Sequence, residues 1–450
     1  MTDNAALNYA ISLAKPIIAV YVHSPDEDAS WSSGAASNWW LHQSLKQLSV
    51  KLSALNIKLQ FLNTDSVTAI PDIVEEANID TVIWTNRHEP VRVECENTLS
   101  KVLQQKNISV KRFKDELLTQ PDSFLTASKA TPYRVFTPFY KKLRSQLDLQ
   151  SITSVETQKQ TANSLPSREL KDNVELEQLD LLDENPWHQK LHQHWSTGED
   201  SALDKLDSFI NDTLADYVLQ RDYPAIQGTS GLSPHLHFGE ISPDQIISAL
   251  SPLIHYQDNK IATAAEAFLR QLIWREFARY ILWHYPETAT EPMNKKYSDK
   301  FWNDDKALLK KWQQGNTGIA IIDAGMRELW ETGTMHNRVR MLTASLLTKN
   351  MGLHWLHGAR WFWNTLVDAD LANNSMGWQW VAGCGVDAAP YFRVFNPDTQ
   401  AQKFDRQQHY VNHWTQKLNP QQPAVDLSTS RNDALYRYKK HIKSTPDQAS

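Results

Sequence analysis

The sequence predicts two structural parts, an α/β domain followed by a mostly α-helical domain. From residue 15 to residue 113, short apolar runs alternate with amphipathic runs, which is typical of a parallel sheet with helices on both faces. Beyond Trp187, apolar residues recur three and four positions apart, which is the spacing of helices. A polar stretch at residues 151–185 has neither period and is expected to connect the two parts across a surface.

In the first part, the strands are expected at residues 17–22, 57–62, 81–84 and 110–113, with helices at 38–55 and 91–103. Ligands of such sheets bind beyond the carboxyl ends of strands. The sequence Asn86-Arg87-His88-Glu89 directly follows the third strand. It is therefore a candidate binding loop, with an ordinary polar loop as the alternative.

In the second part, helices are expected at residues 202–210, 243–253, 262–285, 318–331 and 338–348, and Pro286 ends the longest. The segment TPYRVFTPFYKKLR, residues 131–144, follows the α/β domain. After Pro420 the chain is polar, and its end is expected to be mobile. The predicted boundaries are 1–125 for the α/β domain, 126–195 for a linker, 196–420 for the helical domain and 421–450 for a polar tail.

The composition narrows the class of protein. With 450 residues, 41% of them hydrophobic, the chain can form two or three domains with their own cores. Two cysteines cannot supply a disulfide framework or an iron–sulfur cluster. No apolar run can span a bilayer and no signal-peptide pattern is present, so we expect a cytoplasmic protein without a membrane partner. The net charge of −6 leaves room for a local cationic groove.

The stretch from residue 368 to 405 combines carboxylates, amides, aromatic rings and small residues. Such a mixture suits a planar, partly polar ligand, such as a cofactor or a nucleobase, because rings need stacking faces and a few placed polar groups. The alternative is a helix end buried by Trp and capped by Asp and Asn. The residues concerned are Asp368, Asp370, Asn373, Asn374, Trp378, Trp380 and Arg393.

Two motifs could contact phosphates. The loop GTSGLSP at residues 228–234 offers backbone amides and hydroxyls ahead of a helix, although the same residues also form ordinary capped turns. In MHNRVRM, residues 335–341, helical geometry separates Arg338 from Arg340 around the cylinder. The two arginines could thus serve two partners, for example a nucleic-acid phosphate and a cofactor, or both could be solvated.

A third motif, FLRQLIWREFARY at residues 268–280, places Gln271, Trp274 and Arg275 on one helical face. This set suits base stacking and phosphate contact, with a packed core Trp as the alternative. No HExxH or paired CxxC spacing predicts a metal site, and neither Cys lies in a nucleophile signature.

Together these stretches resemble the cryptochrome and photolyase family, most closely its bacterial cyclobutane pyrimidine dimer photolyases. The matching segments, in order along nearly the whole chain, are PYRVFTPF, RDYPAIQGTSGLSPHLHFGEIS, LIWREF, WQQGNTGIAIIDAGMREL and MHNRVRM. The resemblance implies a helical FAD-binding domain and UV-damaged DNA as the partner of a monomer. It also implies a light-driven reaction in which reduced FAD passes an electron to a flipped dimer, the cyclobutane ring splits, and the electron returns.

The resemblance also implies residue roles. Residues for FAD are Tyr217, Thr229, Ser230, Gly231, Leu232, Ser233, Arg275, Arg340, Asp368, Ala369, Asp370 and Asn374. Asn374 would lie beside the reactive ring nitrogen and tune the cofactor. Trp378, Trp355 and Trp302 match a relay that brings electrons from the surface to the flavin. The residues that match the family's lesion pocket and DNA contacts are Arg221, Gln271, Trp274, Arg275, Asn337, Arg338, Met341, Trp380 and Gln400.

Several positions depart from the family pattern. Gln271 stands where relatives usually carry Glu, so it can bond to pyrimidine carbonyls but cannot donate a carboxyl proton. The chain begins near the place where relatives end a WFRRDLR segment, so the first strand of the α/β domain is expected to be missing. An antenna chromophore is implied as well, either methenyltetrahydrofolate or a deazaflavin.

Other functions within the family stay open. One is a cryptochrome that signals in blue light without repair, although plant receptors tend to have Asp at position 374 and long signalling tails. Another is a photolyase of the DASH type, which prefers single strands; Gln at position 271 is similar to the residue in such proteins. Repair of (6-4) photoproducts is disfavoured because such enzymes carry two His where this chain has Asn337 and Met341.

Overall fold

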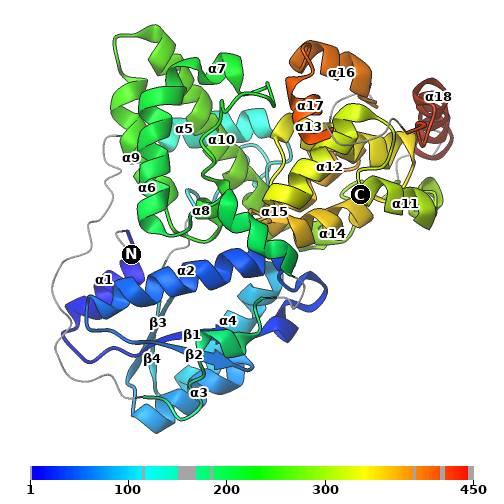
Figure 1. Ribbon diagram of the computed structural model, residues 1–450. Helices are drawn as coiled ribbons and strands as arrows, with labels where there is room; N and C mark the ends of the chain where they lie inside the picture. The colour runs from blue at the N-terminus through cyan, green and yellow to red at the C-terminus, as the bar shows by residue number, and fades with distance from the viewer. Residues whose placement is uncertain are drawn as a thin grey trace. The chain divides into compact units, whose positions relative to one another are not determined.

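The computed structural model describes residues 3–113, 117–149, 169–182, 186–388, 392–415 and 421–443 (Figure 1). The chain forms two compact units that are interleaved in sequence. The first consists of Met1–Phe124, Leu143–Ser208 and Gly231–Ala265, and the second of Leu125–Lys142, Phe209–Ser230 and Glu266–Ser450. The sequential domain boundaries given above stay a prediction.

The first unit contains the four predicted strands. They are β1 (Ala19–His23), β2 (Leu59–Asn63), β3 (Thr81–Thr85) and β4 (Ser109–Phe113). β1 pairs with β2 and β3 pairs with β4, both in parallel. The helices between them are α2 (Ala35–Ser53), α3 (Ser66–Ala77) and α4 (Pro90–Gln105), and α3 had no counterpart in the sequence prediction.

The alternation of side chains along β1 explains why helices cover both faces of this pair. Ala19 and Tyr21 pack into a cluster that includes Leu45 of α2, whereas Val20 and Val22 pack against Ala69 of α3. Successive side chains of a strand point to opposite faces, so both faces need a cover. The α/β class and its two-sided helical cover are confirmed.

The strands form two pairs instead of one continuous sheet. Within the described residues, β1 and β3 each have a single hydrogen-bonded neighbour, and no strand joins them. Helix α1 (Ala5–Ser12) contacts β3 and β4, and the ring of Tyr9 lies 5.4 Å from that of Phe113. One edge of β1 and one edge of β3 therefore lack a strand partner.

Part of the predicted connection belongs to the core of the first unit. Val174 donates its backbone N–H to the carbonyl of Phe61 in β2, and Leu176 and Leu179 are buried beside it. The rest of that stretch, residues 150–168 and 183–185, lies outside the described residues. The unit is completed by α6 (Glu199–Ser208), α8 (Ser233–His237) and α9 (Pro243–Ile254).

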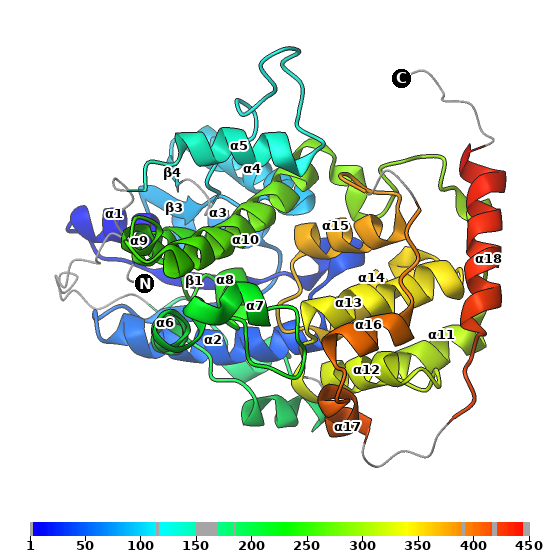
Figure 2. The ribbon, with the colours of Figure 1, turned by 90° about the horizontal axis from the view of Figure 1, so that it is seen from above.

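The second unit is helical (Figure 2). Two helices, α5 (Phe136–Gln146) and α10 (Asn259–His284), contribute residues to both units. The others are α7 (Tyr217–Gln220), α11 (Lys306–Gln313), α12 (Ala320–Thr332), α13 (Asn337–Ser345), α14 (Trp355–Thr365), α15 (Leu371–Ala382), α16 (Pro397–Phe404), α17 (His409–Thr415) and α18 (Leu427–Tyr438). A π-helical turn, Leu346–Asn350, continues α13.

The polar segment after Pro420 contains a helix, α18, whereas the last residues, 444–450, which were expected to be mobile, lie outside the described residues. Asp426 caps α18 by accepting the N–H of Thr429. The hydroxyl oxygen of Ser430 accepts the side-chain amide N–H of Asn350 at 2.9 Å. The composition of this segment is polar because only one face of α18 is buried. No helix in the described ranges is both long and apolar enough to cross a membrane.

Candidate functional site

The polar residues of the 368–405 stretch gather at the start of α15. Asp370 caps this helix, and its Oδ1 accepts the backbone N–H of Asn373 at 2.8 Å. Its Oδ2 lies 3.5 Å from a guanidinium nitrogen of Arg279 on α10, and both side chains are buried. The expected alternative of an Asp-capped helix end is thus present, and the cap also fixes the orientation of the first turn.

A second ion pair lies beside this cap. The guanidinium of Arg340 bonds both carboxylate oxygens of Asp368 at 3.1 Å, and it donates to the carbonyl of Met335 at 2.7 Å. Asn374, one turn into α15, donates its amide to the carbonyl of Ala359 at 2.9 Å. Ala369, which lies between Asp368 and Asp370 in the sequence, is buried. These contacts hold Asp368, Asp370 and Asn374 in fixed positions.

The three relay candidates lie on different elements of the second unit. Trp378 on α15 packs 5.0 Å from the ring of Phe362, and Trp355 opens α14 fully buried. The ring of His354 lies 5.9 Å from Trp355 and 5.0 Å from Trp302. The indole N–H groups of all three Trp are buried without a hydrogen-bond acceptor in the described structure.

The turn after α7 brings several predicted DNA contacts together. Arg221 donates to the side-chain carbonyl of Gln271 on α10 at 3.3 Å, and the neighbouring Asp222 pairs with Arg338 of α13 at 2.8 Å. The guanidinium of Arg338 also lies 4.4 Å above the ring of Phe404, which ends α16. Arg338 and Arg340 therefore have separate partners, and neither is a merely solvated arginine.

The other predicted DNA-contact residues have surroundings of their own. One face of Trp274 is covered by Phe136, with ring centres 3.5 Å apart, so that face is not open for a base. Trp380 donates its indole N–H to the carbonyl of Asp387 at 3.0 Å. Half-buried Arg275, Met341 and Gln400 and exposed Asn337 complete the predicted set.

The candidate phosphate loop crosses from one unit to the other. Thr229 and Ser230 belong to the second unit with Tyr217, whose buried ring packs 5.5 Å from Phe268. Gly231, Leu232 and Ser233 belong to the first unit, where Ser233 begins α8 and Leu232 is buried. Gly231 has a φ of +65°, a conformation that glycine adopts at little cost.

Lys205 lies beside this loop in the first unit. Its ammonium is 3.8 Å from the point where a Cβ atom on Gly231 would stand. Burial lowers the pKa of Lys205, and no carboxylate pairs with it among the residues described. A half-buried amine beside Gly231 is a candidate contact for the phosphates of a dinucleotide.

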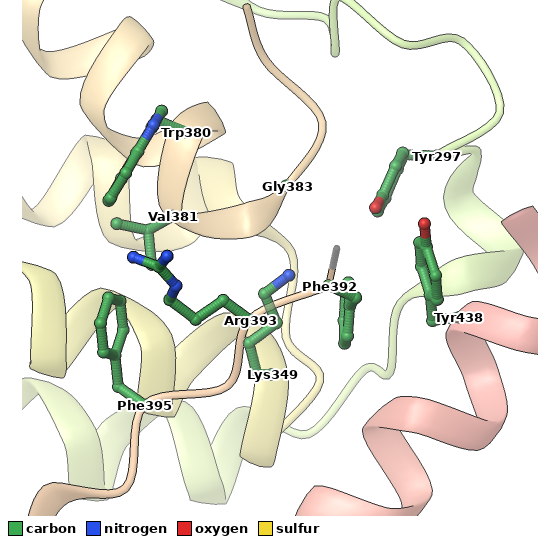
Figure 3. Close-up of a pocket in the computed structure, with 9 residues that line it drawn as sticks. All are labelled: Tyr297, Lys349, Trp380, Val381, Gly383, Phe392, Arg393, Phe395 and Tyr438. Atoms are coloured by element: carbon green, nitrogen blue, oxygen red, sulfur yellow. The ribbon is translucent and has the colours of Figure 1, made fainter. Parts of the chain in front are cut away.

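A pocket lies on the other end of α15 (Figure 3). Phe392, Tyr297 and Tyr438 gather on one side of it, and Trp380, Arg393 and Phe395 on the other. Lys349, which is 1% exposed, reaches between them and donates to the carbonyl of Ala382 at 2.6 Å. Burial lowers the pKa of Lys349 well below its usual value.

Sequence reasoning missed Lys205, Lys349 and the hydrogen-bonded pair of Glu328 and Tyr410. These residues occur within ordinary helical patterns, and their positions depend on helices far apart in the sequence. No local motif distinguishes them from surface residues of an amphipathic helix. Only the packing of α12, α15 and α17 shows their burial.

Comparison with known proteins identifies the family. A family profile described as "DNA photolyase" matches residues 1–161, and one described as "FAD binding domain of DNA photolyase" matches residues 268–440. The chain belongs to the DNA photolyase family. The residues that match the FAD-binding domain lie in the second unit, and FAD is the cofactor.

Three relatives illustrate the range of the photolyase family. The chain is 39% identical to a deoxyribodipyrimidine photo-lyase of Agrobacterium fabrum, over 93% of this chain and 85% of that one. It is 33% identical to cryptochrome-2 of Arabidopsis thaliana, over 92% of this chain and 68% of the relative. The crystal structure of a bacterial class III photolyase from Agrobacterium tumefaciens superposes with a TM-score of 0.90 at 36% identity, covering 98% of this chain and 95% of the other.

The donor groups of the second unit fit a flavin. Beside Asp368, Asp370 and Asn374, the hydroxyl of Ser375 and the indole N–H of Trp378 are buried without hydrogen-bond partners in the described structure. Buried polar groups normally have partners. Orphaned donors near fixed carboxylates and an amide suit a ligand with both donor and acceptor edges, which an isoalloxazine and an adenine have.

Proposed function

We propose that this protein is a deoxyribodipyrimidine photolyase that splits cyclobutane pyrimidine dimers in DNA under blue light. The observation that carries the proposal is that one unit holds both the polar cluster at the start of α15 and the Arg221–Gln271 and Asp222–Arg338 contacts. The first set is suited to a flavin and the second to DNA. The 39% identity to a photo-lyase over most of both chains supports the same reading.

FAD, when bound and reduced, supplies an excited-state electron donor for the dimer. Asp368, Asp370 and Asn374 would hold its polar edges, and the two hydrogen bonds from Arg340 keep Asp368 oriented. Tyr217, Thr229, Ser230, Leu232 and Ser233, with Lys205, bind its phosphates and ribityl chain. Because these groups are placed before the ligand arrives, little reorganisation accompanies the reaction.

Gln271 binds the flipped dimer through its side-chain amide. The side-chain carbonyl of Gln271 accepts a hydrogen bond from Arg221 at 3.3 Å. The NH₂ group of Gln271 donates to the carbonyl of Ala267. When the dimer binds, this NH₂ group exchanges the Ala267 carbonyl for a pyrimidine carbonyl. An amide stabilises the growing negative charge on the dimer by donation, but it transfers no proton. Asn337, Met341 and Trp380 line the lesion, while Arg338 and Gln400 contact the strand.

Trp378, Trp355 and Trp302 act before repair, by reducing oxidised flavin. Their buried indole N–H groups have no acceptor within the described residues, so an oxidised indole has no side chain or carbonyl that takes its proton at once. A retained proton favours passage of the charge to the next Trp over trapping at one site.

The second candidate is a cryptochrome-type photoreceptor. The similarity to cryptochrome-2 of Arabidopsis thaliana favours it, as does an FAD site that would be common to both classes. Asn374 instead of Asp disfavours it, since Asp at this place is usual in the plant receptors the chain resembles. Gln271 favours a third candidate, a DASH-like photolyase with a preference for single strands.

The test is repair of a dimer-containing duplex by purified, pre-reduced protein in blue light and in darkness. A photolyase restores the pyrimidines only in light. A photoreducible flavoprotein that leaves dimers intact in both duplex and single strands would overturn the proposal and favour the receptor. Repair of single strands alone would favour the DASH-like candidate.

The remaining expectations belong to the same proposal. We infer a cytoplasmic protein, because its two free cysteines fit a reducing compartment, and a monomer, as the family resemblance implies. Whether the first unit binds methenyltetrahydrofolate or a deazaflavin is left open. Chromatography of the chromophores released from purified protein distinguishes the two.

A further inference from the structure

Glu328 on α12 lies at the junction of two segments that carry predicted DNA contacts. Its Oε2 accepts the backbone N–H of His336 at 3.2 Å and the hydroxyl of Tyr410 at 2.5 Å. His336 immediately precedes α13, which bears Asn337 and Arg338. Tyr410 belongs to α17, which follows α16 and its Gln400. One carboxylate oxygen therefore joins both segments to α12.

The turn before α13 is also tied to the flavin side. Arg340 donates to the carbonyl of Met335 and to the hydroxyl of Thr334, and it pairs with Asp368. The turn is thus fixed by Arg340 from one side and by Glu328 from the other. Loss of Glu328 leaves the Arg340–Asp368 contacts in place, so the two ends of the turn can be tested separately.

The corner between α16 and α17 depends on the same region. Asp405 is the C-cap residue of α16 and accepts the N–H groups of Tyr410 and Val411 with its two oxygens. Phe404, beside it, packs under the guanidinium of Arg338 at 4.4 Å. Movement of Tyr410 would therefore be passed to Phe404 and Arg338.

The pKa of Glu328 in this junction is shifted toward neutrality. Burial raises its pKa to about 7, against the opposing effects of the Tyr410 hydroxyl, the His336 N–H and the charge of Arg340. Burial also raises the pKa of Tyr410 well above its usual value, and burial lowers that of His336 to about 4. Tyr410 and the His336 ring are hence neutral between pH 6 and 8 on these shifts.

We propose that Glu328 is a positioning residue for DNA binding, which holds the α13 turn and the α16–α17 corner firmly only when its carboxylate is ionised. The ionised oxygen makes charge-assisted hydrogen bonds, which are about twice as strong as neutral ones. Protonation weakens both bonds and removes the attraction to Arg340. DNA binding is therefore coupled to release of a proton.

This inference rests on the proposed function, because its readout is affinity for damaged DNA. The direction follows from linkage: if DNA binds the ionised form better, affinity rises with pH up to about 7 and is level above it. Below that pH, affinity falls by up to about tenfold per pH unit. Retention of FAD is unaffected, since Arg340 and Asp368 keep their contacts.

The experiment measures the dissociation constant of a dimer-containing duplex in the dark, at pH 6 and pH 8 and constant ionic strength, with FAD content from absorbance. The variants are Glu328→Gln, which keeps an acceptor oxygen but has no charge to titrate, and Tyr410→Phe. The matched controls are Glu287→Gln and Tyr436→Phe, both exposed. We expect the wild type and the controls to bind the duplex several-fold more tightly at pH 8 than at pH 6. Glu328→Gln should bind equally at the two pH values, with an affinity between those of the wild type at pH 6 and pH 8.

Two results would overturn the proposal: Glu328→Gln with the full pH dependence of the wild type, or loss of FAD in proportion to loss of DNA affinity. Hydrogen exchange of the 333–338 and 405–411 segments gives a readout that needs no DNA. After correction for intrinsic rates, these segments should be more protected at pH 8 than at pH 6 in the wild type only. If the wild type binds no DNA but shows this difference, the proposed function fails and the positioning role of Glu328 stands.

Discussion

At the scale of residues, the second unit is organised by side chains that are paired with one another. Arg340 with Asp368, Arg279 with Asp370 and Arg338 with Asp222 join helices that are distant in sequence. Removal of one member of a buried pair leaves its partner charged and unpaired, which costs more than the pair contributes. Substitutions here are therefore expected to act on folding and ligand binding together, whereas the Trp residues allow a cleaner test.

Trp378→Phe should abolish photoreduction of oxidised flavin while sparing repair by protein that was reduced beforehand. Phe preserves the packing against Phe362 but is much harder to oxidise than Trp. The measurement is flavin absorbance during illumination with an external electron donor, followed by a repair assay. Trp195→Phe, in the first unit, is the control; unchanged photoreduction in Trp378→Phe would remove it from the relay.

Lys349→Met should stabilise the protein more at pH 7 than at pH 10. Burial lowers the pKa of Lys349, so between its lowered folded value and its unfolded value of about 10.4 the unfolded chain binds more protons than the folded chain. That difference destabilises the folded wild type at neutral pH and vanishes at high pH. Met should thus gain on the order of 1 kcal/mol at pH 7 relative to its effect at pH 10.

Thermal unfolding of Lys349→Met and wild type at the two pH values measures this gain. The lost bond to the carbonyl of Ala382 is the same at both pH values and cancels in the comparison. Lys300→Met, at an exposed position, serves as control. An equal shift in Tm at both pH values would mean that Lys349 is charged in the folded state.

At the scale of elements, the contact between α14 and α15 places Trp378. A Cβ atom on Gly358 of α14 would stand 2.0 Å from the ring of Trp378, whereas one on Gly377 of α15 would meet nothing within 4 Å. The glycine at 358 is thus needed for close approach, and the one at 377 is not. The two positions give a matched pair of Gly→Ala variants on facing helices.

Gly358→Ala should destabilise the protein by about 1–3 kcal/mol, because overpacking forces the Trp378 ring or the helix to move. Gly377→Ala should be neutral or stabilising by up to about 1 kcal/mol, since Ala is the better helix former. Denaturant unfolding and the rate of flavin photoreduction measure both effects. Normal stability and photoreduction in Gly358→Ala would show that the helices separate at no cost.

The strongly periodic elements were predictable from the sequence, and those fixed by long-range packing were not. Strands β1 to β4 and helix α10 lie within two or three residues of their predicted bounds, because each has its own apolar period. Helices α15 and α18 lack a clear apolar face of this kind, and α18 is packed against the turn containing Asn350. The division of the strands into two pairs also depends on which segments meet in space, which no local pattern contains.

The candidate site shows the same division. Asp368 and Asp370 were singled out from the sequence by the mixture of polar, aromatic and small residues around them, and Arg340 by its helical spacing from Arg338; their roles stay a prediction. Covering of Trp274 by Phe136 was not found, because the two residues lie on different helices. Glu328 and Lys349 have the residue types of exposed helix faces, so only their burial in the fold identifies them.

At the scale of the whole molecule, a net charge of −6 must be reconciled with DNA binding. Phosphate contacts release counter-ions, so affinity should fall steeply as salt increases even though the chain is acidic overall. Arg221→Ala should weaken binding and reduce the slope of log affinity against log salt by about 1. A salt-independent affinity would mean that DNA is bound without phosphate contacts, contrary to the roles proposed for Arg221 and Arg338.

The most direct test of light-driven repair follows the dimer and the flavin in the same sample. Pre-reduced protein bound to a dimer-containing duplex is exposed to blue flashes without oxygen, and restored pyrimidines are counted while flavin absorbance is recorded. Because the electron returns after the ring splits, dimers should disappear over many turnovers with the flavin still reduced. Intact dimers, or one flavin oxidised for each dimer lost, would contradict the account.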